Sequence, residues 1–189
     1  MGIRNSCCFK RKDFRLDILM LGLNGSGKTG IVNSLSGDPA ESIRPTFAPT
    51  FTSGTNLSRG LKGVNVGIWE FSGDERFRHD WSTSHLVQEV QAFMFVVDSF
   101  DVGRITEARQ YLFTALQSPK VMGLPVLILA NKQDLSGALS PQEVAEKFSK
   151  LLQHTANPCQ VHGASAVTGV GLRDAISTLA DMAKSSQRN

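Results

Sequence analysis

The stretch LDILMLGLNGSGKTGIVNSLS, residues 16–36, contains the most informative pattern in the chain. Residues 16–23 are mostly apolar, as in a strand buried on both faces, and residues 28–36 have the character of a helix. Between them, residues 22–29 fit the pattern G-x-x-x-x-G-K-[ST]. Glycines let successive backbone N–H groups surround phosphate oxygens at the start of a helix. The stretch therefore predicts a triphosphate-binding loop after the first strand of an α/β fold.

The loop residues have distinct expected roles. Lys28 is expected to reach the β- and γ-phosphates, and the Thr29 hydroxyl to bind Mg²⁺. A chance glycine-rich turn is the alternative, but the strand–loop–helix placement argues against it. The motif specifies a triphosphate without specifying a base, and small kinases share it. The expected nucleotide-binding residues here are Asn24, Gly25, Ser26, Gly27, Lys28, Thr29 and Gly30.

The base is indicated by a second motif, Asn131-Lys132-Gln133-Asp134, which directly follows the apolar run of residues 126–130. It is therefore expected at the carboxyl end of a strand, where open α/β sheets bind ligands. The Asp134 carboxylate can accept hydrogen bonds from guanine N1–H and the exocyclic amine, whereas adenine offers the opposite polarity. A solvated loop is the alternative. Behind a phosphate loop, the pattern favours guanine binding by Asn131, Lys132 and Asp134.

The remaining chain alternates apolar runs with amphipathic segments, which is typical of a mostly parallel sheet with helices on both faces. Helical stripes run through residues 105–116, 144–152 and 172–180, and residues 60–63 are expected to turn a hairpin. We predict about six strands and five helices in all, with a Pro- and Thr-rich loop at residues 39–49 after the first helix. The predicted strands are residues 16–23, 51–57, 64–71, 93–97, 126–130 and 159–162.

Charge is concentrated at the N-terminus of this 189-residue chain of net charge +3. Five basic residues and one acidic residue give residues 1–15 a charge of +4, which leaves −1 for the remainder. This distribution argues against a nucleic-acid-binding face and favours a basic arm next to an acidic leaflet or acidic partner. We expect a monomer with an arm at 1–15, one domain at 16–184 and a flexible tail at 185–189.

The N-terminal arm carries candidate lipidation sites. Residues 1–6 match M-G-x-x-x-[ST], so Gly2 is a candidate for myristoylation, and Cys7 and Cys8 are candidates for palmitoylation. One myristoyl chain binds membranes only marginally, but a second chain or the basic residues 10–12 would stabilise attachment. A disordered basic tail is the alternative. The three cysteines form neither a disulfide framework nor a zinc-ligand spacing, which favours a reducing compartment.

With both motifs identified, the chain resembles the Arf and Arf-like small GTPases from about residue 16 to 182. The matching segments are residues 22–29, Pro45-Thr46, Trp69 before the Gly73 turn, residues 97–99 and residues 131–135. The resemblance implies that Thr46 closes on Mg²⁺ and the γ-phosphate, and that the Gly73 N–H meets the γ-phosphate. It also implies that Ser165, Ala166 and Val167 lie behind the guanine carbonyl.

Two departures from the family pattern concern hydrolysis. Glu70 stands where the family has an aspartate, and could still hold Mg²⁺ through water. Asp74 replaces the glutamine that orients the attacking water, and an ionised carboxylate only accepts hydrogen bonds. We therefore expect slow intrinsic hydrolysis that depends on a GTPase-activating protein. Arg76 and Arg78 are expected to be exposed rather than to act as an arginine finger in cis.

A third departure concerns the partner surface. Trp69 is the expected effector contact, but Pro49 and Ser84 occupy the positions of its aromatic companions. The effector surface should therefore differ from that of the founding Arf proteins.

The resemblance implies a membrane-associated GTP/GDP switch in membrane traffic or organelle targeting. GTP, GDP and Mg²⁺ are its ligands, and an exchange factor, a GTPase-activating protein and effectors are its partners. Its expected place is the cytoplasmic side of a membrane, cycling with the cytosol. The alternative is a GTP-bound scaffold, a pseudo-GTPase with little turnover. A P-loop kinase is disfavoured because residues 131–134 would have no role in it.

Overall fold

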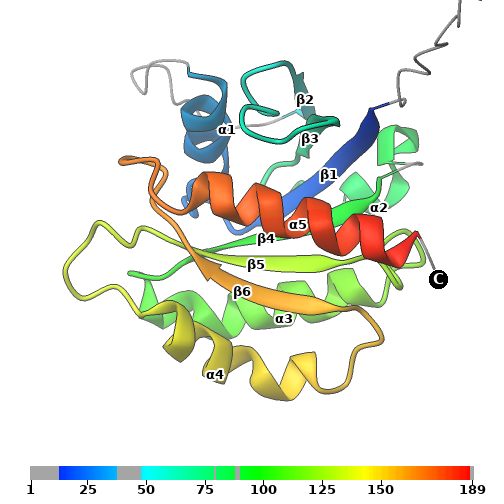
Figure 1. The fold of residues 1–189 in the computed structure, drawn as a ribbon. Coiled ribbons are helices and arrows are strands. Elements are labelled where there is room, and N and C mark those ends of the chain that lie inside the picture. Colours follow the sequence, from blue (N-terminus) through cyan, green and yellow to red (C-terminus); the bar gives the residue numbers. More distant parts are fainter. Residues whose placement is uncertain (1–12, 38–47, 79, 88–89, 188–189) are drawn as a thin grey trace, which may run out of the picture.

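The computed structural model describes residues 13–37, 48–78, 80–87 and 90–187. They form a six-stranded sheet in the order β2-β3-β1-β4-β5-β6 (Figure 1). Only β2 is antiparallel to its neighbour, so the expected mostly parallel sheet is confirmed. The strands are β1 (Phe14–Gly22), β2 (Thr50–Ser53), β3 (Val64–Glu70), β4 (Ala92–Asp98), β5 (Val126–Asn131) and β6 (Cys159–Gly163).

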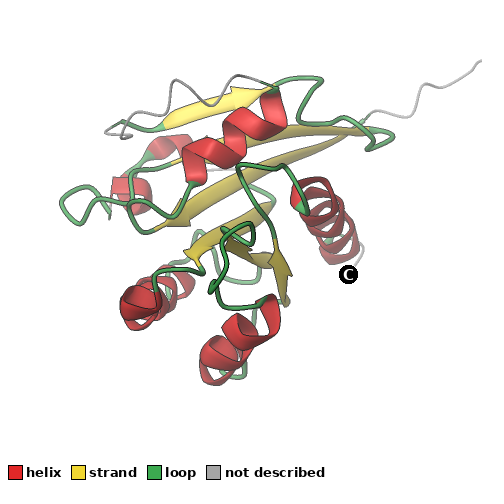
Figure 2. Ribbon diagram, turned by 90° about the vertical axis from the view of Figure 1, so that its left-hand side faces the viewer, coloured by secondary structure: helices red, strands yellow, loops and turns green. Residues whose placement is uncertain are grey.

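Helices cover both faces of the sheet (Figures 1 and 2). The α-helices are α1 (Lys28–Ser36), α2 (Asp80–Thr83), α3 (Ile105–Leu116), α4 (Pro141–Leu152) and α5 (Leu172–Ser186). Helices α1 and α5 pack on one face, and α2, α3 and α4 lie over the other. Two 3₁₀ turns, η2 (His85–Val87) and η3 (Val102–Arg104), precede β4 and α3.

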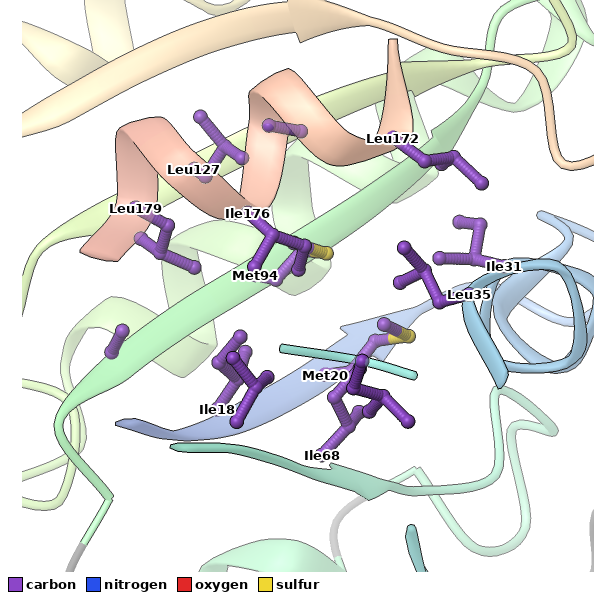
Figure 3. Packing of buried hydrophobic residues seen from close by; sticks show 14 of the residues in the cluster. Ile18, Met20, Ile31, Leu35, Ile68, Met94, Leu127, Leu172, Ile176 and Leu179 are labelled. Atoms are coloured by element: carbon purple, nitrogen blue, oxygen red, sulfur yellow. The ribbon is translucent and has the colours of Figure 1, made fainter. Parts of the chain in front are cut away.

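Two hydrophobic cores follow from this layering. In β4, Met94 and Val96 enter the core under α1 and α5, whereas Phe93 and Phe95 enter the other. Figure 3 shows the first core, where Ile176 of α5 lies beside Met94 of β4. Burial on both faces explains why the central strands are continuous apolar runs in the sequence.

Local sequence fixes several helix ends. The Ser140 side chain accepts a hydrogen bond from Glu143 N, and the Glu143 carboxylate accepts one from Ser140 N, which forms a capping box before α4. Helix α1 ends at Gly37, which adopts the left-handed conformation with φ 83°. At its start, α1 follows Gly27 and receives no side-chain cap. Such a helix start leaves backbone donors available for an anion.

The structure corrects some expected boundaries. Strand β2 ends at Ser53 rather than at Leu57, because Leu57 turns into the core under α1 and α5. Helix α5 continues to Ser186, so residues 185 and 186 of the expected tail are helical. Its apolar stripe extends to the buried Ala183, which keeps the last turns on the sheet. Within the described parts of the chain, no helix combines the length and apolar content needed to cross a bilayer.

Candidate nucleotide-binding site

A cavity of about 730 Å³ lies where β1, β3 and β5 end at the carboxyl edge of the sheet. Most of the residues expected to bind nucleotide line it. Ser26 and Ser165 are buried beneath its surface, and Thr46 lies outside the described residues. The lining residues are Asn24, Gly25, Gly27, Lys28, Thr29, Gly30, Glu70, Ser72, Gly73, Asp74, Arg76, Asn131, Lys132, Asp134, Leu135, Ala166 and Val167.

The phosphate loop depends on glycine at two contacts. Gly27 has φ 94°, and a Cβ there would collide with the side-chain nitrogen of Asn131. A Cβ on Gly73 would collide with the backbone of Gly22, Leu23 and Asn24. The backbone of Gly73 is joined to the loop, because Asn24 N donates to Gly73 O at 3.1 Å. Only glycine permits these close approaches.

Lys28 lies inside the loop that precedes it. Its Nζ donates to the carbonyls of Gly22 at 2.9 Å and Leu23 at 3.0 Å. Burial lowers the pKa of Lys28 to about 8, against a smaller opposite influence from Glu70. A phosphate group would restore the missing negative charge next to this ammonium group.

The predicted metal ligands Thr29 and Glu70 are in direct contact. The Thr29 hydroxyl donates to Glu70 Oε1 at 2.5 Å, and Glu70 is buried at the end of β3. Hydroxyl and carboxylate oxygens are the ligand types that Mg²⁺ prefers, with phosphate oxygens and water completing its shell. This donor set therefore fits Mg²⁺. In the described residues no cluster of three or more His, Cys, Asp or Glu residues could hold a metal on its own.

The guanine motif is bound to the phosphate loop by Asn131. Its Nδ2 donates to Ser26 O at 2.8 Å, and its Oδ1 accepts from Ala166 N at 3.0 Å. Asn131 is 1% exposed, so both bonds are shielded from water. One side chain thus connects the phosphate loop, the end of β5 and the loop after β6.

The other residues of the guanine motif are also held in place. Ser165 Oγ donates to Asp134 Oδ1 at 2.6 Å, which orients an otherwise exposed carboxylate toward the loop after β6. Lys132 has φ 67°, an uncommon conformation for a residue other than glycine, and its Nζ contacts Asp98 Oδ2 at 2.6 Å. Leu135 adds a partly exposed apolar surface to the cavity.

Asp74 lines the cavity but is occupied by a neighbour. Arg76 donates from Nε to Oδ1 at 2.9 Å and from Nη2 to Oδ2 at 2.8 Å, and Arg76 N also donates to Oδ1 at 3.0 Å. These bonds lower the pKa of Asp74 to about 2. From the sequence we identified Asp74 and Arg76 but did not predict that they form an ion pair.

Arg78 contradicts the expectation of an exposed arginine. Its side chain is 12% exposed and contacts Glu107 of α3 at 2.8 Å. Tyr111 OH donates to Arg78 O at 2.8 Å, and the guanidinium lies over the Tyr111 ring. Helix α3 thus anchors the segment that follows Asp74, through one acceptor, Glu107, and one donor, Tyr111, each about thirty residues away in sequence.

Trp69 has an aromatic companion at a position other than Pro49 and Ser84. Phe51 of β2 pairs with Trp69 of β3 across the antiparallel ladder. Their ring centroids are 4.5 Å apart, and Phe51 is 40% exposed. The pair forms an aromatic surface at the edge of the sheet.

The predicted lipidation sites Gly2, Cys7 and Cys8 lie outside the described residues.

A phosphate loop after β1, a guanine motif after β5 and this sheet order define the small GTPase class of P-loop protein. Residues 4–183 match the ADP-ribosylation factor family model. The chain belongs to that family, and the predicted resemblance is confirmed.

Known relatives agree with this assignment. ADP-ribosylation factor-like protein 3 of Chlamydomonas reinhardtii is 36% identical over 87% of this chain and 89% of its own length. ADP-ribosylation factor-like protein 2 of Dictyostelium discoideum is 34% identical over 88% of this chain and 86% of its own. The Arl6 BBS3 small GTPase of Trypanosoma brucei, solved with the nucleotide analogue GppNp, superposes with a TM-score of 0.77. It is 26% identical, with 91% of this chain and 99% of that chain covered.

Proposed function

We propose that this chain binds GTP and GDP with Mg²⁺ and acts as a regulatory switch with slow intrinsic hydrolysis. The observation that carries the proposal is the single cavity shared by the phosphate loop, the Thr29–Glu70 pair and the guanine motif. The nucleotide-analogue complex of the Arl6 relative supports a guanine nucleotide as the ligand.

In this proposal different groups of residues bind the phosphates and the guanine base of the nucleotide. Lys28 and the N–H groups of residues 24–30 bind the phosphates, with Gly73 approaching the γ-phosphate. Thr29 and Glu70, the latter through water, hold Mg²⁺, which would neutralise phosphate charge and fix the geometry of the β- and γ-phosphates. Asp134 and Lys132 bind the guanine base, and Ala166 and Val167 lie behind it.

Slow hydrolysis is supported by the pairing of Asp74 with Arg76. Hydrolysis requires a water aligned with the γ-phosphorus, and the bond to the leaving β-phosphate oxygen breaks as the water attacks. A carboxylate that is ionised and held by Arg76 cannot donate a hydrogen bond to that water or to the γ-phosphate. A GTPase-activating protein would have to complete the site.

The alternative function is a GTP-bound scaffold with little turnover, a pseudo-GTPase. The same Asp74–Arg76 pair favours it. GTP retained by protein purified from its native cell would favour the scaffold, whereas GDP would favour a switch that turns over.

We also propose attachment to the cytoplasmic face of a membrane through acyl chains on Gly2, Cys7 and Cys8, assisted by the basic arm. The reason is the sequence motif together with the charge of residues 1–15. Mass spectrometry of protein from its native cell tests this. An unmodified N-terminus with free thiols at residues 7 and 8 would remove the proposal, whatever the outcome of nucleotide binding.

Effectors are proposed to bind at the Phe51–Trp69 surface, next to the site. Trp69 directly precedes Glu70, a proposed metal ligand, in β3. A shift of Glu70 would therefore also shift Trp69. Comparing partner capture by Trp69→Ala, Phe51→Ala and Phe113→Ala tests the assignment. Phe113 is a matched control, because it is an exposed phenylalanine on α3.

The nucleotide proposal is tested by equilibrium binding of fluorescent GDP to the full-length protein, with unlabelled GTP and ATP as competitors. GTP should displace the probe, whereas ATP at about 100-fold higher concentration should not. Equal displacement by ATP would contradict guanine selection by Asp134.

A further inference from the structure

Arg104 reaches the phosphate loop from η3. Its Nη1 donates to Asn24 Oδ1 at 2.8 Å and to Asn24 O at 3.2 Å. Its Nη2 lies 3.8 Å from the position that a Cβ on Gly25 would take. The family motifs did not identify this residue, and eighty positions separate it from Asn24.

The other edge of the guanidinium is held from the end of β4. Nε donates to Asp101 Oδ2 at 2.6 Å, and Asp101 N donates in turn to Asp98 Oδ1 at 3.3 Å. Asp98 Oδ2 accepts from Lys132 Nζ at 2.6 Å. A continuous series of polar contacts therefore runs from the phosphate loop to the guanine motif.

We propose that Arg104 is a positioning residue for the nucleotide, which fixes the phosphate loop relative to the guanine motif through Asp101, Asp98 and Lys132. The inference rests on the proposed function of this cavity. Asn131 already joins the two loops through Ser26. A second connection further restricts their relative motion, so less ordering is needed when a nucleotide binds.

The strained backbone of Lys132 gives this connection a specific task. A lysine at φ 67° persists only where its surroundings hold it, and the Asp98 contact holds the end of its side chain. Asp98 also accepts from Asp101 N and Phe100 N, so its carboxylate is fixed by the same turn that presents Arg104. Loss of Arg104 would loosen the turn and the phosphate loop together.

A direct electrostatic role is the competing explanation, because an arginine near Gly25 could attract phosphates without positioning anything. The two roles differ in their dependence on charge. A direct attraction would be preserved by lysine and would matter more for GTP than for GDP. Positioning needs a guanidinium that bonds to Asn24 with one edge and to Asp101 with the other. Its loss should accelerate the release of GDP and GTP alike.

The experiment measures the dissociation rates of GDP and GTP from the full-length protein with Mg²⁺ present. Arg104→Ala should accelerate release of both nucleotides about tenfold. Arg104→Lys and Asp101→Asn should fall within about threefold of Arg104→Ala. Asparagine at 101 keeps the N-cap acceptor for Arg104 N but removes the charged partner of the guanidinium. Arg109→Ala is the control, because Arg109 is an exposed arginine of α3.

Several results would overturn the proposal. Release from Arg104→Ala within about twofold of wild type would show that the connection does not position the nucleotide. Restoration by Arg104→Lys, with a larger loss for GTP than for GDP, would indicate direct attraction instead. Circular dichroism and thermal unfolding separate either result from misfolding, and Arg104→Gln provides a milder variant. A wild-type protein that binds no guanine nucleotide would overturn the proposed function, and this inference with it.

Discussion

The guanidinium of Arg76 holds both carboxylate oxygens of Asp74, at 2.9 Å and 2.8 Å. Asp74 follows Gly73, where the family resemblance places a glutamine that orients water. The pairing keeps Asp74 ionised and occupies its oxygens, and its pKa of about 2 makes it a poor proton acceptor at neutral pH. The same pairing also places a cation in the lining of the cavity, next to the proposed phosphate site.

Base selection should change when Asp134 is replaced by asparagine. The amide group can accept from N1–H but repels the exocyclic amine of guanine, whereas it can donate to the C2 carbonyl of xanthine. Asp134→Asn should weaken GDP binding about 100-fold or more and improve binding of xanthosine diphosphate. Competition against fluorescent GDP and its xanthosine counterpart measures both changes. An unchanged guanine preference would remove Asp134 from the site.

Replacing Asn131 by alanine should reduce both stability and nucleotide affinity. The change leaves the buried Ser26 O and the partly buried Ala166 N without their partner. The free energy of unfolding should fall by about 2–3 kcal/mol, as measured by urea denaturation. Asn65→Ala, an exposed asparagine in β3, should change it by less than about 0.5 kcal/mol. Similar losses in both variants would contradict a bridging role for Asn131.

The nucleotide-free protein should become more stable as the pH rises above about 8. Burial lowers the pKa of Lys28 to about 8 from 10.5, so the unfolded chain binds more protons than the folded chain between these values. Stability should therefore rise by about 2 kcal/mol between about pH 7.5 and 9.5. Denaturation of Lys28→Met at the same pH values supplies the reference, because methionine cannot titrate. Parallel pH profiles of the two proteins would contradict the lowered pKa.

Arg173 should stabilise the β2–β3 hairpin. It lies in the first turn of α5 and donates to the carbonyls of Leu35, at the end of α1, and of Asn56 and Leu57, in the hairpin loop. Arg173→Ala should lower the free energy of unfolding by about 1–2 kcal/mol. Chemical denaturation next to Arg109→Ala, which should remain near wild type, measures this. A wild-type midpoint for Arg173→Ala would mean that water replaces these bonds without cost.

The sequence predicted the elements whose pattern depends on local physics. Strands buried on both faces, such as β1 and β4, appear as continuous apolar runs, and glycines mark the loop that must approach phosphates. No residue range was predicted for helix α2, because a segment of four residues carries little periodic signal.

Apart from the local Asp74–Arg76 pair, the missed contacts depend on side chains brought together from distant parts of the chain. Phe51 contacts Trp69 because the register between β2 and β3 places them opposite each other. The family pattern did not predict this pair. Arg78 is largely shielded because its partners Glu107 and Tyr111 lie on α3. Arg104 contacts Asn24 because η3, which follows β4, lies next to the phosphate loop. Such pairings require the three-dimensional arrangement.

Single-turnover hydrolysis of GTP by the wild type and by Asp74→Gln tests the central claim, that this switch has slow hydrolysis because Asp74 replaces a water-orienting glutamine. The glutamine amide can both donate and accept, so Asp74→Gln should hydrolyse GTP at least about tenfold faster than the wild type, with GTP affinity unchanged within about threefold. A wild-type rate equal to or above that of Asp74→Gln would contradict the account.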